Sequence, residues 1–451
     1  MIGNGGSLVG LDKDMEISRR RFLTGSIAGF AAVGLPSWFA KEAEASGDEK
    51  SLAKGRKIGA NDTIQVGVIG PGGRKGGYRQ GLHDTRAIAG QPGVKVVAAC
   101  DVDDIHMKEA CETFGADCKG YKDFRELLAR KDIDAVVIGT PDHWHAYICI
   151  AAMKAGKDVY CEKPLTLTID QGKKLVKVWR ETKRVFQTGS QQRSEDRFRL
   201  ACELVRNGRV GRIKKVTAGL PGGPTGGPFE AQPTPSDLDW DMWLGPAFYT
   251  DYVPERTHGS FRWWLEYSGG MLTDWGAHHN DIAQWGLGTD RSGPVSVQAY
   301  GQGPKIGVNC YSTFPEFKVT CVYENGVPLI VTNEGPNGVH FYGEEGWIFV
   351  SRGEIKASDQ KLIDDPLPDN AVRLYESNDH AGNFVECIRS RKQPICDAEI
   401  GHRSVSICHL CNVSLRLGGR KLKWDPVKEE FVGDPEANAM LSRPVRGLWR
   451  V

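Results

Sequence analysis

The chain has 451 residues, of which 40% are hydrophobic and 25% are charged, and its formal net charge at pH 7 is +1. This length is enough for two or three domains, and the composition is typical of a soluble globular protein apart from the abundance of glycine, 55 residues. Because acidic and basic residues are interspersed and balanced, the sequence argues against nucleic-acid binding and against a polybasic membrane-binding role.

An export signal is predicted at the start of the chain. The stretch Ser18-Arg19-Arg20-Arg21-Phe22-Leu23-Thr24 matches a twin-arginine signal, and a mildly apolar run follows over 27–40. This run is too short and too rich in Gly and Ala for a spanning helix, and Ala43-Glu44-Ala45 fits a cleavage site. We therefore predict a signal peptide over 1–45 and a polar linker over 46–60. The alternatives are an uncleaved anchor and a chance run of arginines.

The predicted signal has consequences for location. Twin-arginine substrates are exported folded, so we expect a periplasmic or other extracytoplasmic protein that binds its cofactor before export. No stable membrane association is expected after the signal is cleaved.

A dinucleotide-binding turn is predicted after the first strand, 63–69. The segment Gly70-Pro71-Gly72-Gly73-Arg74-Lys75-Gly76-Gly77 separates this strand from a helix that begins near Tyr78. Gly70 permits a tight turn, and Gly72 lets the backbone approach a pyrophosphate at the helix N-terminus. The turn is one residue longer than G-x-G-x-x-G if its last glycine is Gly76, and it is shorter if that glycine is Gly73. The expected phosphate-binding residues are Gly70, Gly72, Gly73 and Arg74.

Asp101 follows the second predicted strand, 95–100, at about the spacing expected of a carboxylate that binds the adenosine ribose. A carboxylate there would repel a 2′-phosphate, so NAD is favoured over NADP. The alternative is an ordinary surface acid at the end of a strand.

Two further strands end in polar residues at the same predicted edge of the sheet. The strand 134–139 is broken by Thr140-Pro141-Asp142-His143-Trp144-His145, and a helix is predicted over 146–155. The strand 159–161 ends at Glu162-Lys163-Pro164, and Pro164 stops it. Lys163 can therefore point into a cofactor cleft. The pKa of lysine falls readily on burial, so Lys163 can serve as an acid or base; a solvated turn lysine is the alternative.

The alternation continues with a helix over 166–182 and a last strand over 184–189. Alternating strands and helices over 61–190 predict an α/β fold with a doubly wound parallel (Rossmann) sheet.

An aromatic-rich loop follows in the second domain. A helix over 195–207 and a strand over 212–220 precede a long Pro/Gly loop over 221–260. Flat rings beside charged groups are typical of a sugar-binding surface, and rings that merely pack to fix the loop are the alternative. The candidate substrate-binding residues are Arg262, Trp263, Trp264 and Tyr267.

A second catalytic candidate comes from 274–281, which we predict to begin a helix. Asp274, His278 and Asp281 are spaced i, i+4, i+7 and share one helix face. An acid can orient an imidazole for proton transfer. His279 points about 100° away, so His278 is preferred; metal ligation or helix capping would fit the spacing equally well.

The rest of the chain predicts an open, mostly antiparallel sheet with helices. Short alternating strands occupy 295–357, where Asn325-Gly326 indicates a hairpin, and helices are expected over 379–389 and 401–417. A last strand ends near 425. The second, α+β domain is thus predicted over 191–425, with a tail over 426–451.

Cysteine usage predicts no metal site. Cys408-His409-Leu410-Cys411 has a metal-like spacing, but no second ligand pair accompanies it, so we interpret it as helical core.

The order of these motifs resembles one family. A glycine turn, then Glu162-Lys163-Pro164, then Gly269-Gly270 with Asp274-x-x-x-His278 is similar to the glucose–fructose oxidoreductase, inositol dehydrogenase and rhizopine catabolism (Gfo/Idh/MocA) family over 61–425. The stretches 140–145, 383–389 and 401–404 resemble an exported branch of that family.

The resemblance implies a nicotinamide-binding domain and a second domain whose flat sheet forms a homo-oligomer, a dimer or a tetramer. It implies that Lys163 and His278 carry proton transfer and substrate contact, and that Asp274 orients His278 or the substrate. The residues implied to lie near the cofactor are Asp101 at the adenosine ribose, and His145 and Glu162 near the nicotinamide ribose. Thr140 and Lys163 are further candidate cofactor-binding residues.

The expected activity is hydride transfer between NAD(P) and a CH–OH group of a sugar, polyol or sugar derivative. Because an exported enzyme meets no nicotinamide pool, we expect a tightly bound cofactor that each cycle regenerates. The alternatives are a redox-neutral sugar lyase, epimerase or glycosidase that uses transient oxidation, and a non-catalytic sugar- or nucleotide-binding protein.

Overall fold

The computed structural model describes residues 55–56, 58–59, 62–304, 307–447 and 449. The predicted signal peptide, 1–45, lies outside the described residues, as does most of the predicted linker. Within the described part, no helix combines the length and the apolarity that crossing a membrane requires.

The first sheet is a parallel Rossmann sheet, as predicted. Its six strands run in the order β3-β2-β1-β4-β5-β6, and every neighbouring pair is parallel. The strand order reverses between β1 and β4, which is where such sheets bind ligands at their carboxyl edge. The strands are β1 (Ile64–Ile69), β2 (Val94–Cys100), β3 (Lys119–Tyr121), β4 (Ala135–Ile138), β5 (Asp158–Cys161) and β6 (Phe186–Thr188).

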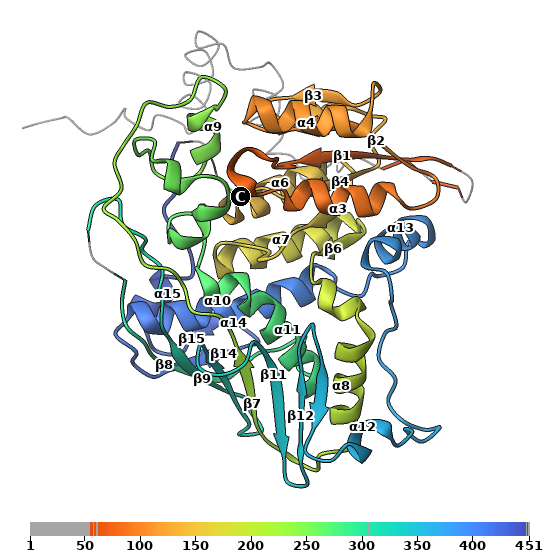
Figure 1. The fold of residues 1–451 in the computed structure, drawn as a ribbon, viewed down its shortest axis with the longest axis vertical. Coiled ribbons are helices and arrows are strands. Elements are labelled where there is room, and N and C mark those ends of the chain that lie inside the picture. The colour runs from red at the N-terminus through yellow and green to blue at the C-terminus, as the bar shows by residue number, and fades with distance from the viewer. Residues whose placement is uncertain (1–54, 57, 60–61, 305–306, 448, 450–451) are drawn as a thin grey trace, which may run out of the picture. The chain divides into compact units, whose positions relative to one another are not determined.

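Helices cover this sheet because its strands are apolar on both faces. All four residues of β4 are buried, as are all four of β5, so neither face can meet water. Figure 1 shows the helices packed around the sheet. They are α3 (Gln80–Ala89), α4 (Asp104–Phe114), α5 (Phe124–Ala129), α6 (Asp142–Lys154) and α7 (Ile169–Thr182).

Two parts of this domain differ from the sequence patterns. Helix α6 begins at Asp142, so the stretch expected only to break the strand also supplies the first helical turn. The segment 102–133, for which no element was predicted, forms α4, β3 and α5.

The second sheet has nine strands in the order β13-β12-β11-β7-β10-β9-β8-β14-β15. Of its paired strands only β7 and β10 are parallel, so the prediction of a mostly antiparallel sheet is confirmed. The predicted hairpin joins β9 to β10, with Gly326 at φ +81°. The strands are β7 (Ile213–Gly219), β8 (Ser296–Tyr300), β9 (Lys318–Val322), β10 (Pro328–Thr332), β11 (Gly338–Gly343), β12 (Trp347–Val350), β13 (Ile355–Ala357), β14 (Leu422–Asp425) and β15 (Glu430–Phe431).

Helices pack on this second sheet and tie it to the first. Helix α14 packs against α7 of the Rossmann domain and against α11, and α13 packs against α3. Buried Phe384 and Ile388 of α13 belong to the same apolar cluster as β1. The helices are α8 (Asp196–Arg206), α10 (Met271–Asp274), α11 (Gly276–Leu287), α12 (Lys361–Asp364), α13 (His380–Ser390), α14 (Ala398–Arg416) and α15 (Pro435–Ala439).

The cysteines are core residues. All twelve are unpaired, and Cys408 and Cys411 are fully buried in α14. The interpretation of 408–411 as helical core is confirmed.

The long loop after β7 is not structureless. It contains α9 (Trp240–Leu244) and the short helices η4 (Pro254–Arg256) and η5 (His258–Trp263). We call residues 235–262 the strap. Its backbone pairs with the start of α4: Asp104 N–H donates to Asp237 O at 2.8 Å, and Asp239 N–H donates to Val102 O at 2.9 Å. The strap therefore lies across the carboxyl edge of the Rossmann sheet, where Figure 1 shows α9.

Candidate active site and cofactor cleft

A cavity of about 90 Å³ lies at the carboxyl edge of β1, β2 and β4, beneath the strap. Four residues predicted to bind the cofactor line it: Gly70, Gly72, Asp101 and Thr140. The strap contributes Leu238, Met242, Trp243, His258 and Phe261 to the same wall. The cleft is thus built by both domains.

The glycine turn has the backbone that close approach requires. Gly70 and Gly72 have φ angles of +71° and +65°, which disfavour other residues. A Cβ on Gly72 would lie 2.4 Å from Tyr78 O, and one on Gly70 would lie 2.6 Å from the side chain of Thr140. The hydroxyl oxygen of Thr140 is buried without a hydrogen-bond partner. This cradle fits the pyrophosphate of NAD.

The additional residues of the glycine turn form a short helix. Residues Lys75–Gly77 form η2, so α3 starts at Gln80, two residues later than expected. Gly73 and Arg74 lie outside the cavity wall. Gly73 N–H donates to Tyr78 O at 3.0 Å, and exposed Arg74 faces Glu109.

Asp101 ends β2 with its carboxylate facing the glycine turn. Its Oδ2 accepts a hydrogen bond of 3.2 Å from Gly72 N–H, and its Oδ1 accepts one of 3.0 Å from Asp103 N–H. The carboxylate therefore lies against the glycine cradle.

Lys163 and Asp274 form the centre of the candidate active site. Lys163 Nζ lies 2.6 Å from Asp274 Oδ1 and 3.3 Å from the Asp274 backbone carbonyl. Arg262 Nε donates to the same Oδ1 at 3.3 Å. Burial favours an uncharged Asp274, but the charges of Lys163 and Arg262 outweigh burial and hold the pKa of this carboxyl well below its usual range.

The same pair keeps Lys163 charged. Burial alone would lower the pKa of Lys163, as the sequence argument expected. The charges of Asp274 and Glu162 overcome burial, so the pKa is raised instead. Lys163 is therefore a partly buried cation, suited to donating a proton and to stabilising an oxyanion.

His278 is buried close to this pair, but it is not bonded to Asp274. Its Nε2 lies 3.2 Å from Arg352 Nη2, and its Nδ1 is buried without a partner. Burial, then the charges of Lys163 and Arg352, lower the pKa of His278 well below its usual value, so the ring is neutral. His279 points elsewhere, to Asn337 Oδ1 at 2.8 Å, in line with the preference for His278.

The shared helix face predicted for residues 274, 278 and 281 is wrong in part. Trp275 separates α10 from α11, so Asp274 ends one helix and His278 lies in the next. Asp281 is 1% exposed and pairs with buried Arg193 at 2.7 and 2.8 Å. Asp281 is therefore part of the buried core, and it is not a partner of the His278 imidazole.

Glu162 and His145 are buried beneath the site. Glu162 accepts hydrogen bonds from Lys163 N–H at 3.1 Å and from Gln191 Nε2 at 2.7 Å. Burial and then the charge of Asp84 raise its pKa well above the usual value. The two ring nitrogens of His145 lie 2.8 Å from Pro164 O and 2.8 Å from Thr140 O, which ties the two turns together.

The four candidate substrate-binding residues differ in whether they pack the protein or reach the candidate site. Trp264 and Tyr267 are each 1% exposed, and Arg256 stacks on Trp264 at 3.8 Å from the ring centroid. Their ring faces are covered by protein, which favours packing over sugar contact. Trp263 packs partly buried against the core of the second domain. Arg262 alone of the four reaches Asp274, and its guanidinium lies 4.1 Å from the centroid of the Tyr78 ring.

Three residues of this region were not predicted. Asp142, in the first turn of α6, accepts a hydrogen bond of 2.5 Å from Ser268 Oγ, and burial raises the pKa of its carboxyl to about 7. Tyr78 packs under Arg262, and Arg352 reaches His278 from the turn after β12. The polar stretch 140–145 could have indicated Asp142 from the sequence. No local sequence pattern indicates Arg352.

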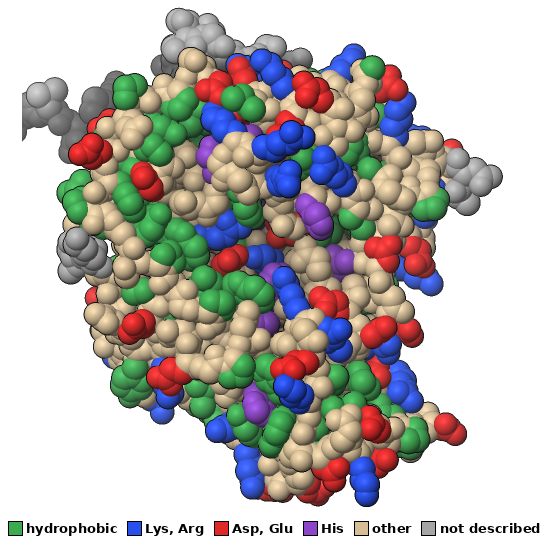
Figure 2. Space-filling model, in the orientation of Figure 1, with side chains coloured by type: hydrophobic (Ala, Val, Ile, Leu, Met, Phe, Trp, Pro, Cys, Tyr) green, Lys and Arg blue, Asp and Glu red, His purple; other side chains and the backbone are tan. Residues whose placement is uncertain are grey.

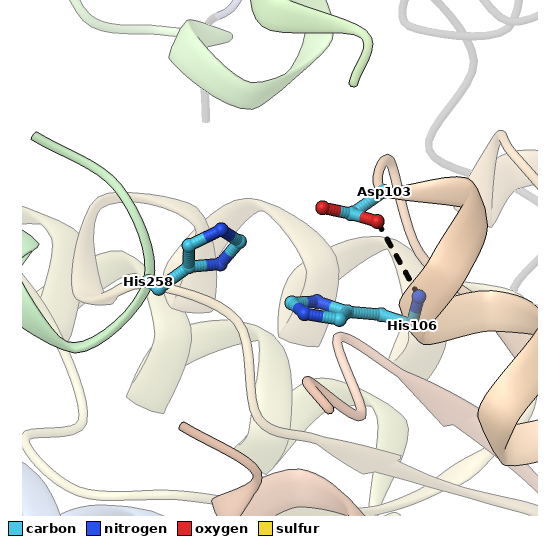
Figure 3. A group of neighbouring side chains, drawn as sticks. All are labelled: Asp103, His106 and His258. Atoms are coloured by element: carbon cyan, nitrogen blue, oxygen red, sulfur yellow. Dashed lines mark hydrogen bonds between the residues drawn. The ribbon is translucent and has the colours of Figure 1, made fainter. Parts of the chain in front are cut away.

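One group among the described residues has the geometry of a metal site. Ligand atoms of Asp103, His106 and His258 lie within 4.8 Å of one another (Figure 3). Asp103 caps α4 by accepting hydrogen bonds from Ile105 N–H at 2.9 Å and His106 N–H at 3.4 Å. Its other oxygen binds Lys75 Nζ at 2.9 Å, and His106 Nε2 contacts Lys75 O at 2.9 Å. Asp103 and His106 therefore have partners already, and the ring of His258 from the strap lies against that of His106, with the ring centroids 4.9 Å apart.

In comparisons with known proteins, both halves of the chain match models of one oxidoreductase family. Residues 64–190 match the model of the oxidoreductase family, NAD-binding Rossmann fold, and residues 226–451 match that of the oxidoreductase family, C-terminal alpha/beta domain. The chain is 25% identical over 373 residues to a myo-inositol 2-dehydrogenase of Thermotoga maritima, covering 78% of this chain and 96% of the relative. An uncharacterized oxidoreductase, YrbE, of Bacillus subtilis is 23% identical over 373 residues, covering 79% and 95%.

A solved structure has a similar fold. The WlbA dehydrogenase of Chromobacterium violaceum, in complex with NADH and UDP-GlcNAcA, aligns with a TM-score of 0.61 at 21% identity. The alignment covers 82% of this chain and 98% of that one.

Proposed function

This chain belongs to the Gfo/Idh/MocA oxidoreductase family and is an NAD-binding enzyme; we propose that it transfers a hydride between a tightly held NAD and a CH–OH carbon of a sugar or polyol. The observation that carries the proposal is the partly buried Lys163–Asp274 pair, 2.6 Å apart, at the carboxyl edge of the sheet that holds the glycine cradle. The substrate class is also that of the Thermotoga maritima relative, which acts on myo-inositol.

The proposed chemistry assigns separate roles to three side chains. Bound nicotinamide supplies the hydride acceptor or donor. Lys163, kept cationic by Asp274, stabilises negative charge on the substrate oxygen. His278 is neutral, so it can hydrogen-bond the substrate hydroxyl and accept its proton in the oxidative direction, and it returns the same proton in the reductive direction.

Residues of the cradle would hold the cofactor. Gly70, Gly72 and Thr140 offer the space and the unpartnered hydroxyl for the pyrophosphate, and Asp101 faces the adenosine ribose. A carboxylate there disfavours a 2′-phosphate, which is why NADP is the less favoured cofactor.

The strap supports tight retention of the cofactor. It crosses the edge of the cleft and is fixed by two backbone hydrogen bonds, and Lys75 Nζ forms ion pairs with both Asp103 and Asp237. A dinucleotide beneath the strap leaves only when these contacts open. Retention favours a second candidate function, a redox-neutral lyase, epimerase or glycosidase in which the sugar is oxidised and then reduced again.

Two further parts of the proposal concern the whole protein. Export by the twin-arginine route rests on residues 18–24, which lie outside the described residues. A dimer or tetramer would use the second sheet, where buried residues of strand β9 alternate with exposed or half-buried ones and Tyr300 of β8 is 62% exposed.

The test begins with protein purified without added cofactor. Bound nucleotide is released by denaturation and identified by mass spectrometry, and the native protein is then screened with sugars, sugar acids and polyols without added NAD. Stoichiometric NAD with turnover of one substrate supports internal recycling. An empty protein that consumes free NAD in proportion to sugar shows an ordinary dehydrogenase and refutes the tight-cofactor proposal. Sugar binding without any turnover would indicate a non-catalytic binding protein.

A further inference from the structure

Arg352 stands at the substrate side of the candidate site. It lies in the turn between β12 and β13, and its Nη2 donates to His278 Nε2 at 3.2 Å. Its guanidinium also stacks on Trp275, 4.8 Å from the ring centroid. The aromatic contact fixes the plane of the guanidinium, and the side chain is otherwise exposed.

The partner of Arg352 is unusual. Among the described residues no carboxylate forms an ion pair with it; its one side-chain hydrogen bond goes to a neutral imidazole. The charge of half-buried Glu195 interacts with that of Arg352. Burial raises the pKa of the Glu195 carboxyl, although the charges of Arg352 and Arg197 act to lower it. An arginine fork is best satisfied by two oxygens of an anion, so this guanidinium has binding capacity left.

The charges of the described residues around the site leave Arg352 without a carboxylate partner. Lys163, Arg262 and Arg352 are cations; among the described residues Asp274 forms ion pairs with the first two, and the charge of Glu162 acts on Lys163. Figure 2 shows basic, histidine and acidic side chains in the middle of this face. A guanidinium without a carboxylate partner attracts an anionic ligand and discriminates against a neutral one.

The contact between Arg352 and His278 affects the proton position as well. Because Nε2 accepts a hydrogen bond from Arg352, the neutral ring carries its hydrogen on Nδ1. In this arrangement Nε2 is blocked as a base. A ligand that draws the guanidinium away exposes Nε2 to the substrate hydroxyl.

We propose that Arg352 is the substrate's anion receptor, and that the substrate of this enzyme is an acidic sugar, carrying a carboxylate, sulfate or phosphate near the reacting carbon. This rests on the proposed function, because it assumes that Lys163 and His278 face the substrate. Binding of the anion moves Arg352 off His278, so that the same contact recognises the ligand and prepares the base.

The experiment measures binding to the NAD-loaded full chain by calorimetry. The probes are matched pairs: D-glucuronate with D-glucose, D-galacturonate with D-galactose, and D-glucose 6-sulfate and 6-phosphate with D-glucose. We expect at least one acid to bind about 10- to 100-fold more tightly than its neutral partner, the range of a charge-assisted pair. Which acid binds distinguishes carboxylate, sulfate and phosphate.

The variants separate the receptor from the scaffold. Arg352→Ala should bring the affinity for the acid down to that for the neutral sugar, and Arg352→Lys should restore part of the difference. Lys356→Ala is the matched control: Lys356 lies on β13 of the same hairpin, is 61% exposed and pairs with Glu354 at 2.6 Å. It should leave both affinities unchanged.

Three outcomes overturn the proposal: equal binding of acids and neutral sugars by the wild type, an acid preference that persists in Arg352→Ala, and no binding of any acid in the panel. None of them requires turnover. An acid preference lost with Arg352 in a protein that turns over no substrate would refute the proposed function and leave the anion receptor standing.

Discussion

The Nζ atom of Lys163 lies 2.6 Å from Oδ1 of Asp274, across 111 positions of sequence. Lys163 lies two residues after the end of β5 of the Rossmann sheet, and Asp274 ends α10 of the second domain. The pair therefore forms only when the two domains are assembled. It also reverses the effect of burial on the lysine, whose pKa is raised because Asp274 and Glu162 are close.

Removing the lysine charge is expected to abolish turnover without emptying the cofactor cleft. Lys163→Met deletes the cation that contacts the oxyanion, and the loss should be about 1000-fold or more in kcat. The measurement is turnover of the substrate found in the sugar screen, with bound nucleotide quantified in the same preparation. Exposed Lys174 on α7, changed to Met, is the control. Wild-type turnover by Lys163→Met would remove Lys163 from the mechanism.

Replacing Asp274 is expected to move the alkaline limit of activity. In Asp274→Asn the amide carries no charge, so burial is no longer outweighed and the pKa of Lys163 falls. Protonated Lys163 is then lost at lower pH, and the alkaline limb of kcat/KM shifts towards acid. A pH profile of both proteins measures this shift. An alkaline limb at the wild-type position would show that Asp274 does not hold the lysine proton.

Asp101 is expected to set the choice of cofactor. Asp101→Ala removes the acceptor for the adenosine ribose and the repulsion of a 2′-phosphate, so NAD should bind more weakly and NADP relatively better. Affinities of the apo protein for both dinucleotides measure the ratio. Asp103 is unsuitable as a control, because it caps α4 and binds Lys75. A native preference for NADP would contradict the assignment.

The sequence was sufficient to predict the architecture and the Rossmann side of the candidate site. Strand periodicity, glycine turns and Pro164 located β1, β4 and β5, because these signals are local. Lys163 and Asp101 follow such strands directly, so their position at the carboxyl edge could be predicted. The two domain folds were predicted for the same reason.

What could not be predicted depends on contacts between distant segments. Trp264 and Tyr267 look like a sugar platform in sequence, but Arg256 and the strap cover them. Asp281 has the spacing of a catalytic acid, yet it pairs with Arg193, 88 residues away. Arg352 lies in an ordinary turn, and only tertiary packing brings it to His278, 74 residues away.

Asp142 is expected to make the protein less stable as pH rises. Burial raises the pKa of its carboxyl to about 7, so between pH ~4 and ~7 the folded state holds a proton that the unfolded state has released. Stability therefore falls as pH rises through this window, by on the order of 4 kcal/mol.

The variant Asp142→Asn tests this linkage. The amide cannot ionise, so the difference in unfolding free energy between wild type and variant should shift in favour of the variant from pH 5 to pH 8. Denaturant unfolding at both pH values measures it. Asp369→Asn, at an exposed position, is the control. The same difference at pH 5 and pH 8 would show that Asp142 is already ionised in the folded protein.

The last prediction concerns how the cofactor leaves. Lys75 bridges Asp103 of the Rossmann domain and Asp237 of the strap, so opening the strap breaks at least one ion pair. Asp237→Asn should speed NAD release about fivefold, since a partly exposed ion pair contributes up to about 1 kcal/mol. Stopped-flow release of NADH, followed by its fluorescence, measures the rate. Asp117→Asn, which removes the exposed Lys95–Asp117 pair of the same domain, should release at the wild-type rate.

Salt provides an independent check on the same contact. Because surface ion pairs are screened, release from the wild type should accelerate with ionic strength, and release from Asp237→Asn should respond less. Identical release from Asp237→Asn and wild type at low salt would show that the strap does not gate the cleft. Tight retention would then have to come from the glycine cradle and Asp101 alone, and a substitution at Asp101 would control the release rate instead.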